Sequence, residues 1–121
     1  MCGIIAILSK NNCSKILLNG LKQLQNRGYD SAGICTLINN NFSIIKYASN
    51  NESAISKLEN NINKLEDSYI GIAHTRWATH GAKTDYNSHP HISFNNKISL
   101  VHNGIIENYL ELKKKIIKYK I

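Results

Sequence analysis

The 121-residue sequence has few of the features that typify several protein classes. Its three cysteines, Cys2, Cys13 and Cys35, lack C-x-x-C spacing, which argues against a disulfide framework and against a zinc finger or ribbon. It has a single proline, Pro90, and no low-complexity linker. No apolar run approaches the roughly 18 residues of a membrane span, and the first ten residues lack the basic start of a secretory signal. We therefore expect one domain of a soluble, cytoplasmic protein that does not bind membranes.

Arginine is scarce as well. The formal net charge is +7, yet only Arg27 and Arg76 among the 15 basic residues are arginine. Nucleic-acid surfaces favour arginine for bidentate contacts, so this lysine-borne charge does not indicate nucleic-acid binding. The densest lysine run, at 113–120, ends an expected helix, where lysine complements the helix dipole. In a chain so rich in lysine, the two retained arginines indicate positions that need a guanidinium.

Apolar patterning predicts an alternation of strands and helices. Turn residues at 39–41 join two expected strands into a hairpin. Ser14 is expected to cap the first helix, and Gly28 is expected to end it. This order predicts an α+β architecture with antiparallel pairing rather than a doubly wound parallel sheet. The expected strands are 3–9, 32–38, 42–48, 69–74 and 98–102, and the expected helices are 14–26, 52–66 and 106–118.

Cys2 is a candidate nucleophile because of its position. The residue after Met1 is small, so we expect Met1 to be removed and Cys2 to become the N-terminus. A free α-amine has a reference pKa near 7.7–8.0 and can accept the thiol proton, so one residue supplies both nucleophile and base. Taken alone, Cys2 is better interpreted as a small apolar residue that opens a strand, because many chains begin with Met-Cys.

Two further stretches could carry chemistry. Asn103 and Gly104 follow an expected strand and could donate two N–H groups to an oxyanion, although Asn-Gly is also a common turn. Arg76 leaves another strand in the stretch HTRWATHG, where a guanidinium could bind a carboxylate bidentately. The alternative there is an arginine stacked on Trp77 in a capped loop. Five histidines lie within residues 74–102, but few carboxylates accompany them, so we predict no metal site.

Five blocks in order resemble the class II glutamine amidotransferases. They are most similar to the glutaminase domain of the glutamine–fructose-6-phosphate aminotransferases (glucosamine-6-phosphate synthases). Amidophosphoribosyltransferase, the alternative within this class, usually has RGQESAG where this chain has RGYDSAG. The blocks are MCGIIAI at 1–7, NRGYDSAG at 26–33, GIAHTRWATHG at 71–81, NSHPH at 87–91 and VHNGIIEN at 101–108.

The resemblance implies a fold and a set of roles. The fold is the αββα four-layer sandwich of the N-terminal-nucleophile hydrolases, of which this chain would contain the N-terminal half. Cys2 would attack the side-chain amide of glutamine and form a γ-glutamyl thioester, with Asn103 and Gly104 as the oxyanion hole and no cofactor. Arg76 would hold the α-carboxylate of glutamine, together with Thr79 and His80. Trp77 would close the ammonia route, and Arg27 would organise the N-terminus.

The chain also departs from the family pattern. The family's glutaminase domain is about twice as long and has a later aspartate that binds the α-ammonium of glutamine. The sugar-isomerase domains that use fructose 6-phosphate are absent from residues 1–121, and the full-length family is expected to form homodimers. We therefore expect residues 1–121 to be a partial glutaminase domain that is inactive by itself. A non-catalytic, truncated remnant is the alternative.

Overall fold

The computed structural model describes residues 2–78 and 81–119. Its centre is a four-stranded sheet with the order β1-β4-β2-β3, in which every neighbouring pair is antiparallel. The strands are β1 (Gly3–Leu8), β2 (Ser31–Ile38), β3 (Asn41–Ala48) and β4 (Ile70–Arg76). Antiparallel pairing and the α+β class are thus confirmed. This pairing matters for function because it sets the start of β1 beside the end of β4.

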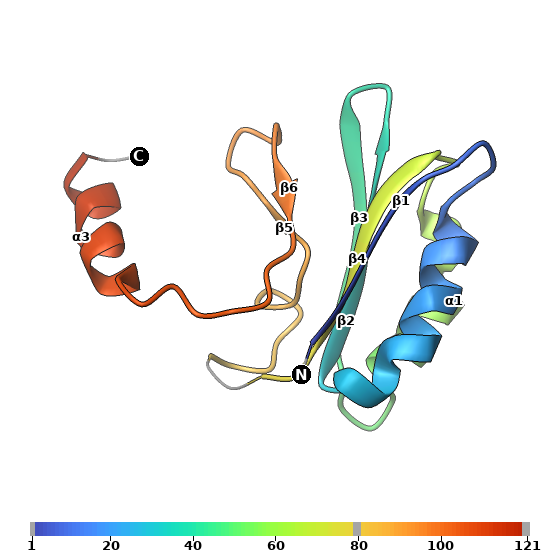
Figure 1. Cartoon of the computed structure of the whole chain (residues 1–121), viewed down its shortest axis with the longest axis horizontal. Coiled ribbons are helices and arrows are strands. Elements are labelled where there is room, and N and C mark those ends of the chain that lie inside the picture. The colour runs from blue at the N-terminus through green and yellow to red at the C-terminus, as the bar shows by residue number, and fades with distance from the viewer. Residues whose placement is uncertain (1, 79–80, 120–121) are drawn as a thin grey trace.

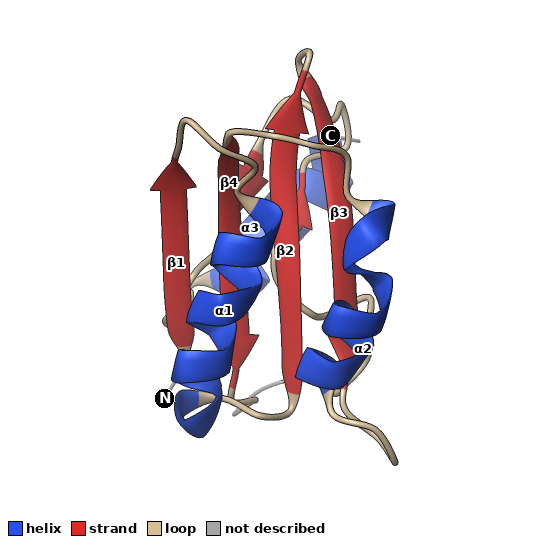
Figure 2. Ribbon diagram, turned by 90° about the vertical axis from the view of Figure 1, so that its right-hand side faces the viewer, coloured by secondary structure: helices blue, strands red, loops and turns tan. Residues whose placement is uncertain are grey.

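Two helices cover one face of this sheet. Helix α1 (Ser14–Leu24) connects β1 to β2, and helix α2 (Ala54–Asn61) connects β3 to β4. Figure 1 shows both helices on the same side of the sheet, and Figure 2 shows them in front of the strands. Apolar residues recur at helical spacing in both helices and so form one apolar face on each. These faces pack against the side chains of the strands that point towards the helices. The resulting core is Cys13, Leu17, Leu18, Leu21, Ala32, Ile34, Ile45, Ala54, Ile55, Leu58, Leu65 and Ala73.

The later part of the chain lies on the opposite face of the sheet. Two short strands, β5 (His91–Ile92) and β6 (Ser99–Leu100), pair with each other, and helix α3 (Tyr109–Tyr119) follows. Figure 1 shows α3 well away from the sheet, beyond β5 and β6. None of the residues of α3 is buried.

The expected hairpin is present, and its turn explains the asparagines there. Strand β2 ends at Ile38 and β3 begins at Asn41, which leaves a two-residue turn. Both turn residues, Asn39 and Asn40, have positive φ angles, of 47° and 61°. Two-residue hairpin turns of this kind need left-handed backbone at both positions, and asparagine tolerates that conformation better than most residues.

Several local predictions were wrong. Ser14 is the first residue of α1 rather than its cap, and the side chain of Asn12 accepts the Ser14 N–H instead, at 3.1 Å. Gly28 does end the helical segment, as the C-cap of the 3₁₀ turn Gln25–Arg27 that continues α1, but with an extended backbone (φ −169°) instead of a left-handed turn. The strand expected at 98–102 is shortened to Ser99–Leu100, and β5 was not predicted. Helix α2 ends early and continues as a 3₁₀ turn at Ile62–Lys64.

None of the described helices is both long enough and apolar enough to span a membrane.

Candidate functional site

Cys2 lies at the start of β1, next to the end of β4. The N–H of Gly3 donates to Oγ1 of Thr75 at 3.1 Å and holds the two strand ends together. The backbone N–H of Trp77 points at the sulfur of Cys2, with an N···Sγ distance of 3.3 Å. Cys2 is a partly exposed residue, and the backbone of Trp77 orients its sulfur. A thiolate would strengthen the N–H···S contact because the acceptor would then carry charge.

Asn103 joins this site from the other end of the chain. Its side-chain Nδ2 donates to the carbonyl oxygen of Cys2 at 3.2 Å, across 101 positions of sequence. Its Oδ1 lies 2.8 Å from Nε2 of His74, on β4. The next residue, Gly104, has a φ of +152°, and a Cβ there would lie 2.9 Å from the His102 ring. A glycine is therefore needed where the chain turns past Cys2. The structure thus brings Asn103 into contact with Cys2, and Gly104 follows Asn103 directly.

Arg76 is the last residue of β4, at the end of the sheet where β1 begins. Its Nη1 donates to the carbonyl oxygen of Ala82 at 3.2 Å, so the loop after β4 folds back over the guanidinium. Gly28 lets the chain pass close beneath, because a Cβ there would lie only 2.7 Å from the backbone carbon of Arg76. Gly28 therefore both ends the 3₁₀ turn and leaves room for the close approach of Arg76.

The remaining predicted site residues are less tightly placed. Trp77 is 45% exposed, and its ring meets that of Tyr29 edge-on at 5.2 Å between centroids. Arg27 is exposed at the end of the 3₁₀ turn Gln25–Arg27. Thr79 and His80 lie outside the described residues.

Sequence reasoning missed two buried polar residues beneath the site. His74 is only 1% exposed, and Asp30 only 5%. One carboxylate oxygen of Asp30 accepts the Ala78 N–H, while Oδ1 has no hydrogen-bond partner among the described residues. The sequence indicated these two residues only through their position inside the blocks NRGYDSAG and GIAHTRWATHG. Neither block shows which side of its strand will be buried.

Three histidines form a largely uncharged cluster beside Asn103. The rings of His74 and His89 stack with centroids 4.4 Å apart, and His91 meets His89 edge-on at 4.4 Å. Burial, with a smaller contribution from the neighbouring His74, His91 and Arg76, lowers the pKa of His89 to about 3. Burial also lowers the pKa values of His74 and His91. In the described part of the chain, no three His, Cys, Asp or Glu side chains are grouped so that they could hold a metal ion.

The other two cysteines differ from Cys2 in their surroundings. Cys13 and Cys35 are both buried, and burial raises the pKa of each thiol. A higher thiol pKa means less thiolate at neutral pH, and the thiolate is the nucleophile. Of the three cysteines, Cys2 alone is partly exposed.

Comparison with known proteins identifies relatives of this region. No protein-family model matches the chain. It is 50% identical over 120 residues to the glutamine–fructose-6-phosphate aminotransferase [isomerizing] of Buchnera aphidicola, covering 98% of this chain and 19% of the relative. It is 48% identical over 121 residues to a probable enzyme of that name from Acanthamoeba polyphaga mimivirus, covering 98% of this chain and 20% of the relative. The corresponding enzyme of Cyanidium caldarium is 44% identical over 113 residues, and the match covers 93% of this chain and 18% of the relative.

A solved structure has the same fold. The glutamine phosphoribosylpyrophosphate amidotransferase of B. subtilis, complexed with ADP and GMP, matches with a TM-score of 0.77 and 26% identity. The match covers 98% of this chain and 25% of that one. The α+β fold is thus that of an N-terminal-nucleophile amidotransferase. The chain spans about a fifth of the length of the curated relatives it matches. In sequence and in fold, it corresponds to the N-terminal glutamine amidotransferase region of the glutamine–fructose-6-phosphate aminotransferases.

Proposed function

We propose that this chain carries the glutaminase site of an amidotransferase and that Cys2 is its nucleophile. The observation that carries the proposal is the contact of Asn103 Nδ2 with the Cys2 carbonyl, at 3.2 Å. It sets a side-chain amide beside a partly exposed sulfur that already accepts a backbone N–H. A nucleophile with N–H donors at its side is the arrangement that acyl transfer requires.

In this proposal, removal of Met1 frees the α-amine of Cys2. The amine accepts the thiol proton, and the sulfur attacks the side-chain amide carbon of glutamine. The C–N bond then breaks, the proton passes to the leaving nitrogen, and ammonia departs. Water attacks the remaining γ-glutamyl thioester, which releases glutamate and returns the proton to sulfur. Both steps pass through an oxyanion, which Asn103 Nδ2–H and the Gly104 N–H would stabilise.

The substrate's α-carboxylate would bind to Arg76. Arg76 follows Thr75, which pairs with Gly3 beside Cys2, and its guanidinium donates to the Ala82 carbonyl. A guanidinium presents two parallel N–H groups to a carboxylate, which fixes the orientation of the bound amino acid as well as its charge. Thr79 and His80 belong to the loop that follows, and we propose that they complete this pocket.

The fate of the ammonia depends on parts of the protein beyond residues 1–121. We propose glutamine and fructose 6-phosphate as the substrates of the whole protein, with glucosamine 6-phosphate as its product. Identities of 44–50% to relatives of that name support this, against 26% to the phosphoribosylpyrophosphate enzyme. Residues 1–121 would supply the front part of the glutaminase domain, and a homodimer would be the working form. Three free cysteines favour a reducing compartment, so we propose the cytoplasm.

The test is modification by a glutamine-analogue affinity label, read by peptide mass spectrometry together with intact mass. We expect the loss of Met1 and a label on Cys2. Cys13 and Cys35 serve as internal controls because they are buried in the same chain. Cys2→Ala should abolish glutamine-dependent ammonia release by the protein, whereas Cys35→Ala should not. Labelling of another cysteine, or activity that survives Cys2→Ala, would refute the proposal.

A further inference from the structure

His74 connects the packed sheet to the loop that carries Asn103. It lies on β4 opposite Gly33 of β2, and its ring is 1% exposed. Alternate side chains of a strand face opposite sides, and Thr75 contacts the Leu24 carbonyl of α1 on the helical side. The side chain of His74 therefore points to the other face, where Nε2 lies 2.8 Å from Asn103 Oδ1.

The contacts of Asn103 determine which atom of that pair donates. Because Asn103 Nδ2 donates to the Cys2 carbonyl, its Oδ1 is the acceptor, and the proton must lie on Nε2 of His74. Nδ1 of His74 is buried and has no partner among the described residues. Burial also lowers the pKa of His74. The ring is thus neutral, with its proton on Nε2.

This hydrogen bond fixes the rotation of the Asn103 amide. An amide turned by 180° would direct Oδ1 towards the reacting carbonyl, where a second oxygen would repel the developing negative charge. A ring donor on Oδ1 leaves Nδ2 facing Cys2, with one N–H on the Cys2 carbonyl and the other free for an oxyanion. Asn103 itself is exposed, so its neighbours along the loop do little to prevent rotation.

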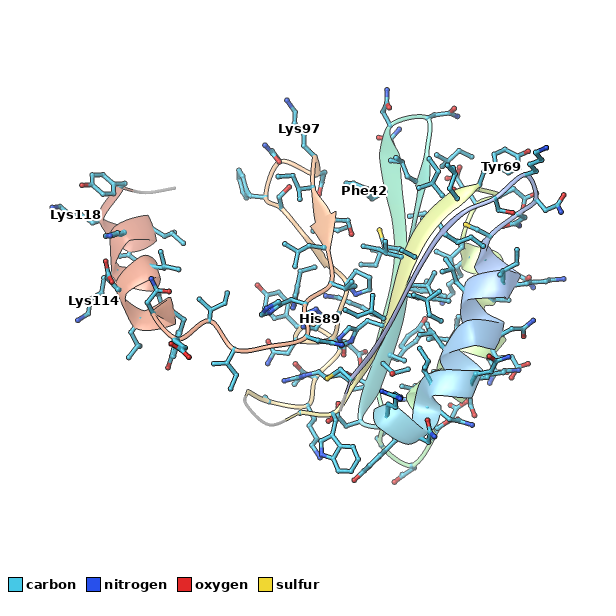
Figure 3. The ribbon with its side chains drawn as sticks, in the orientation of Figure 1. Phe42, Tyr69, His89, Lys97, Lys114 and Lys118 are labelled. Carbon is cyan, nitrogen blue, oxygen red and sulfur yellow. The ribbon has the colours of Figure 1, made fainter. Side chains whose placement is uncertain are left out.

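The His74 ring is itself held in place by His89. The two rings stack with an interplanar angle of 26°, and Figure 3 shows His89 between the sheet and the segment that carries β5 and β6. The chain at His89 can approach because Gly33 has no side chain: a Cβ there would lie 2.2 Å from the His89 carbonyl oxygen. Nζ of Lys46 then donates to the carbonyl oxygens of residues 86, 88 and 90, at 2.8–3.2 Å.

We infer that His74 is a positioning residue, which holds the Asn103 amide in the one orientation that can stabilise an oxyanion, with His89 holding the His74 ring. This inference rests on the proposed glutaminase function. His74 touches no reacting atom and acts through Asn103.

The test uses His74→Phe in the full-length enzyme that contains this chain, because phenylalanine keeps a stacked ring and removes the donor. We expect kcat for glutamine hydrolysis to fall about 10- to 100-fold, somewhat less than for full loss of an oxyanion donor. The KM for glutamine should change less than threefold, because Arg76 is untouched. In an Asn103→Ala background, His74→Phe should have no further effect on kcat, since the two residues act as one unit. Tyr69→Phe, at an exposed position just before β4, is the control, with kcat expected within about twofold of wild type.

Nitrogen-15 spectra of the histidines supply a readout that is independent of activity. We expect His74 to be neutral and protonated on Nε2, and its Nε2 proton to exchange faster with water in Asn103→Ala. Protonation on Nδ1, an unchanged kcat in His74→Phe, or additive effects in the double variant would overturn the inference. Failure of the proposed function is distinguishable: ammonia release would then survive Cys2→Ala, while the histidine spectra would still report the hydrogen bond.

Discussion

The part of the chain before the loop at 77–90 and the part after it are built differently. Every residue of the buried core lies between Cys13 and Ala73, in the sheet β1–β4 and the helices on its one face. From His91 to Tyr119, the chain forms two short strands and a helix without a buried residue. In α3, Leu110, Ile116 and Ile117 are half or more exposed, and Figure 3 shows Lys114 and Lys118 on its outer side.

The candidate site lies where these two parts meet. Cys2, His74 and Arg76 come from the packed sheet, whereas Asn103 and Gly104 come from the loosely packed segment. Within the described residues, the two parts are connected by hydrogen bonds and by ring stacking, partly through His89 of the loop at 77–90. The buried apolar core belongs to the first part alone. The position of Cys2 is therefore secured by the packed sheet, whereas the position of Asn103 depends on a few polar contacts.

The largest difference should appear in stability. Leu21 is fully buried on α1, and Leu21→Ala should lower the free energy of unfolding by about 2–5 kcal/mol, because it removes apolar contacts and leaves a cavity. Ile117→Ala, on the exposed α3, should change it by about 0.5 kcal/mol or less. Urea unfolding followed by circular dichroism measures both. Equal losses would mean that α3 is packed in solution and would remove the contrast between the two parts.

Asn103→Ala should be the most damaging change in the later segment. It should lower kcat for glutamine hydrolysis by roughly 10²–10³-fold, the usual effect of losing one oxyanion donor. Steady-state kinetics of ammonia release by the full-length enzyme is the measurement. An unchanged kcat would restore the simpler interpretation of Asn103-Gly104 as a turn.

Arg76→Lys tests the sheet's side of the site. Lysine keeps the charge but loses the paired N–H geometry, so KM for glutamine should rise by about tenfold while kcat falls less. This split is opposite to that expected for Asn103→Ala. If lysine works as well as arginine at low glutamine, then Arg76 does not bind the α-carboxylate.

Acidification should lower the free energy of unfolding through protonation of His89, which lies where the two parts of the chain meet. The pKa of His89 is about 3 in the folded chain and 6.5 for an ordinary histidine, so the unfolded chain binds more protons between these values. The contribution of His89 to the free energy of unfolding is therefore complete above about pH 6.5, and it is lost as the pH falls towards 3. His89→Phe should flatten this dependence in urea titrations at several pH values. Unchanged pH dependence would exclude His89 as its source.

The sequence by itself determined the elements that depend on local pattern. The apolar runs gave β1 to β4, and helical spacing gave α1 and most of α2, because side-chain period decides which face can be buried. Position alone suggested Cys2, and the scarcity of arginine suggested Arg76. The resemblance to the amidotransferases identified Asn103 and Gly104, which composition could not distinguish from a turn.

Only the tertiary structure decided what lies behind these residues. The partnership of His74 with Asn103 spans 29 positions, and no local pattern encodes which histidine of five will meet the amide. Gly28 and Gly33 resemble ordinary turn or strand glycines until the close approach of Arg76 and His89 shows why a side chain is excluded. Such contacts arise when distant segments meet across the face of a sheet. Local propensity specifies the sheet itself, but packing between segments decides which polar groups are left facing one another.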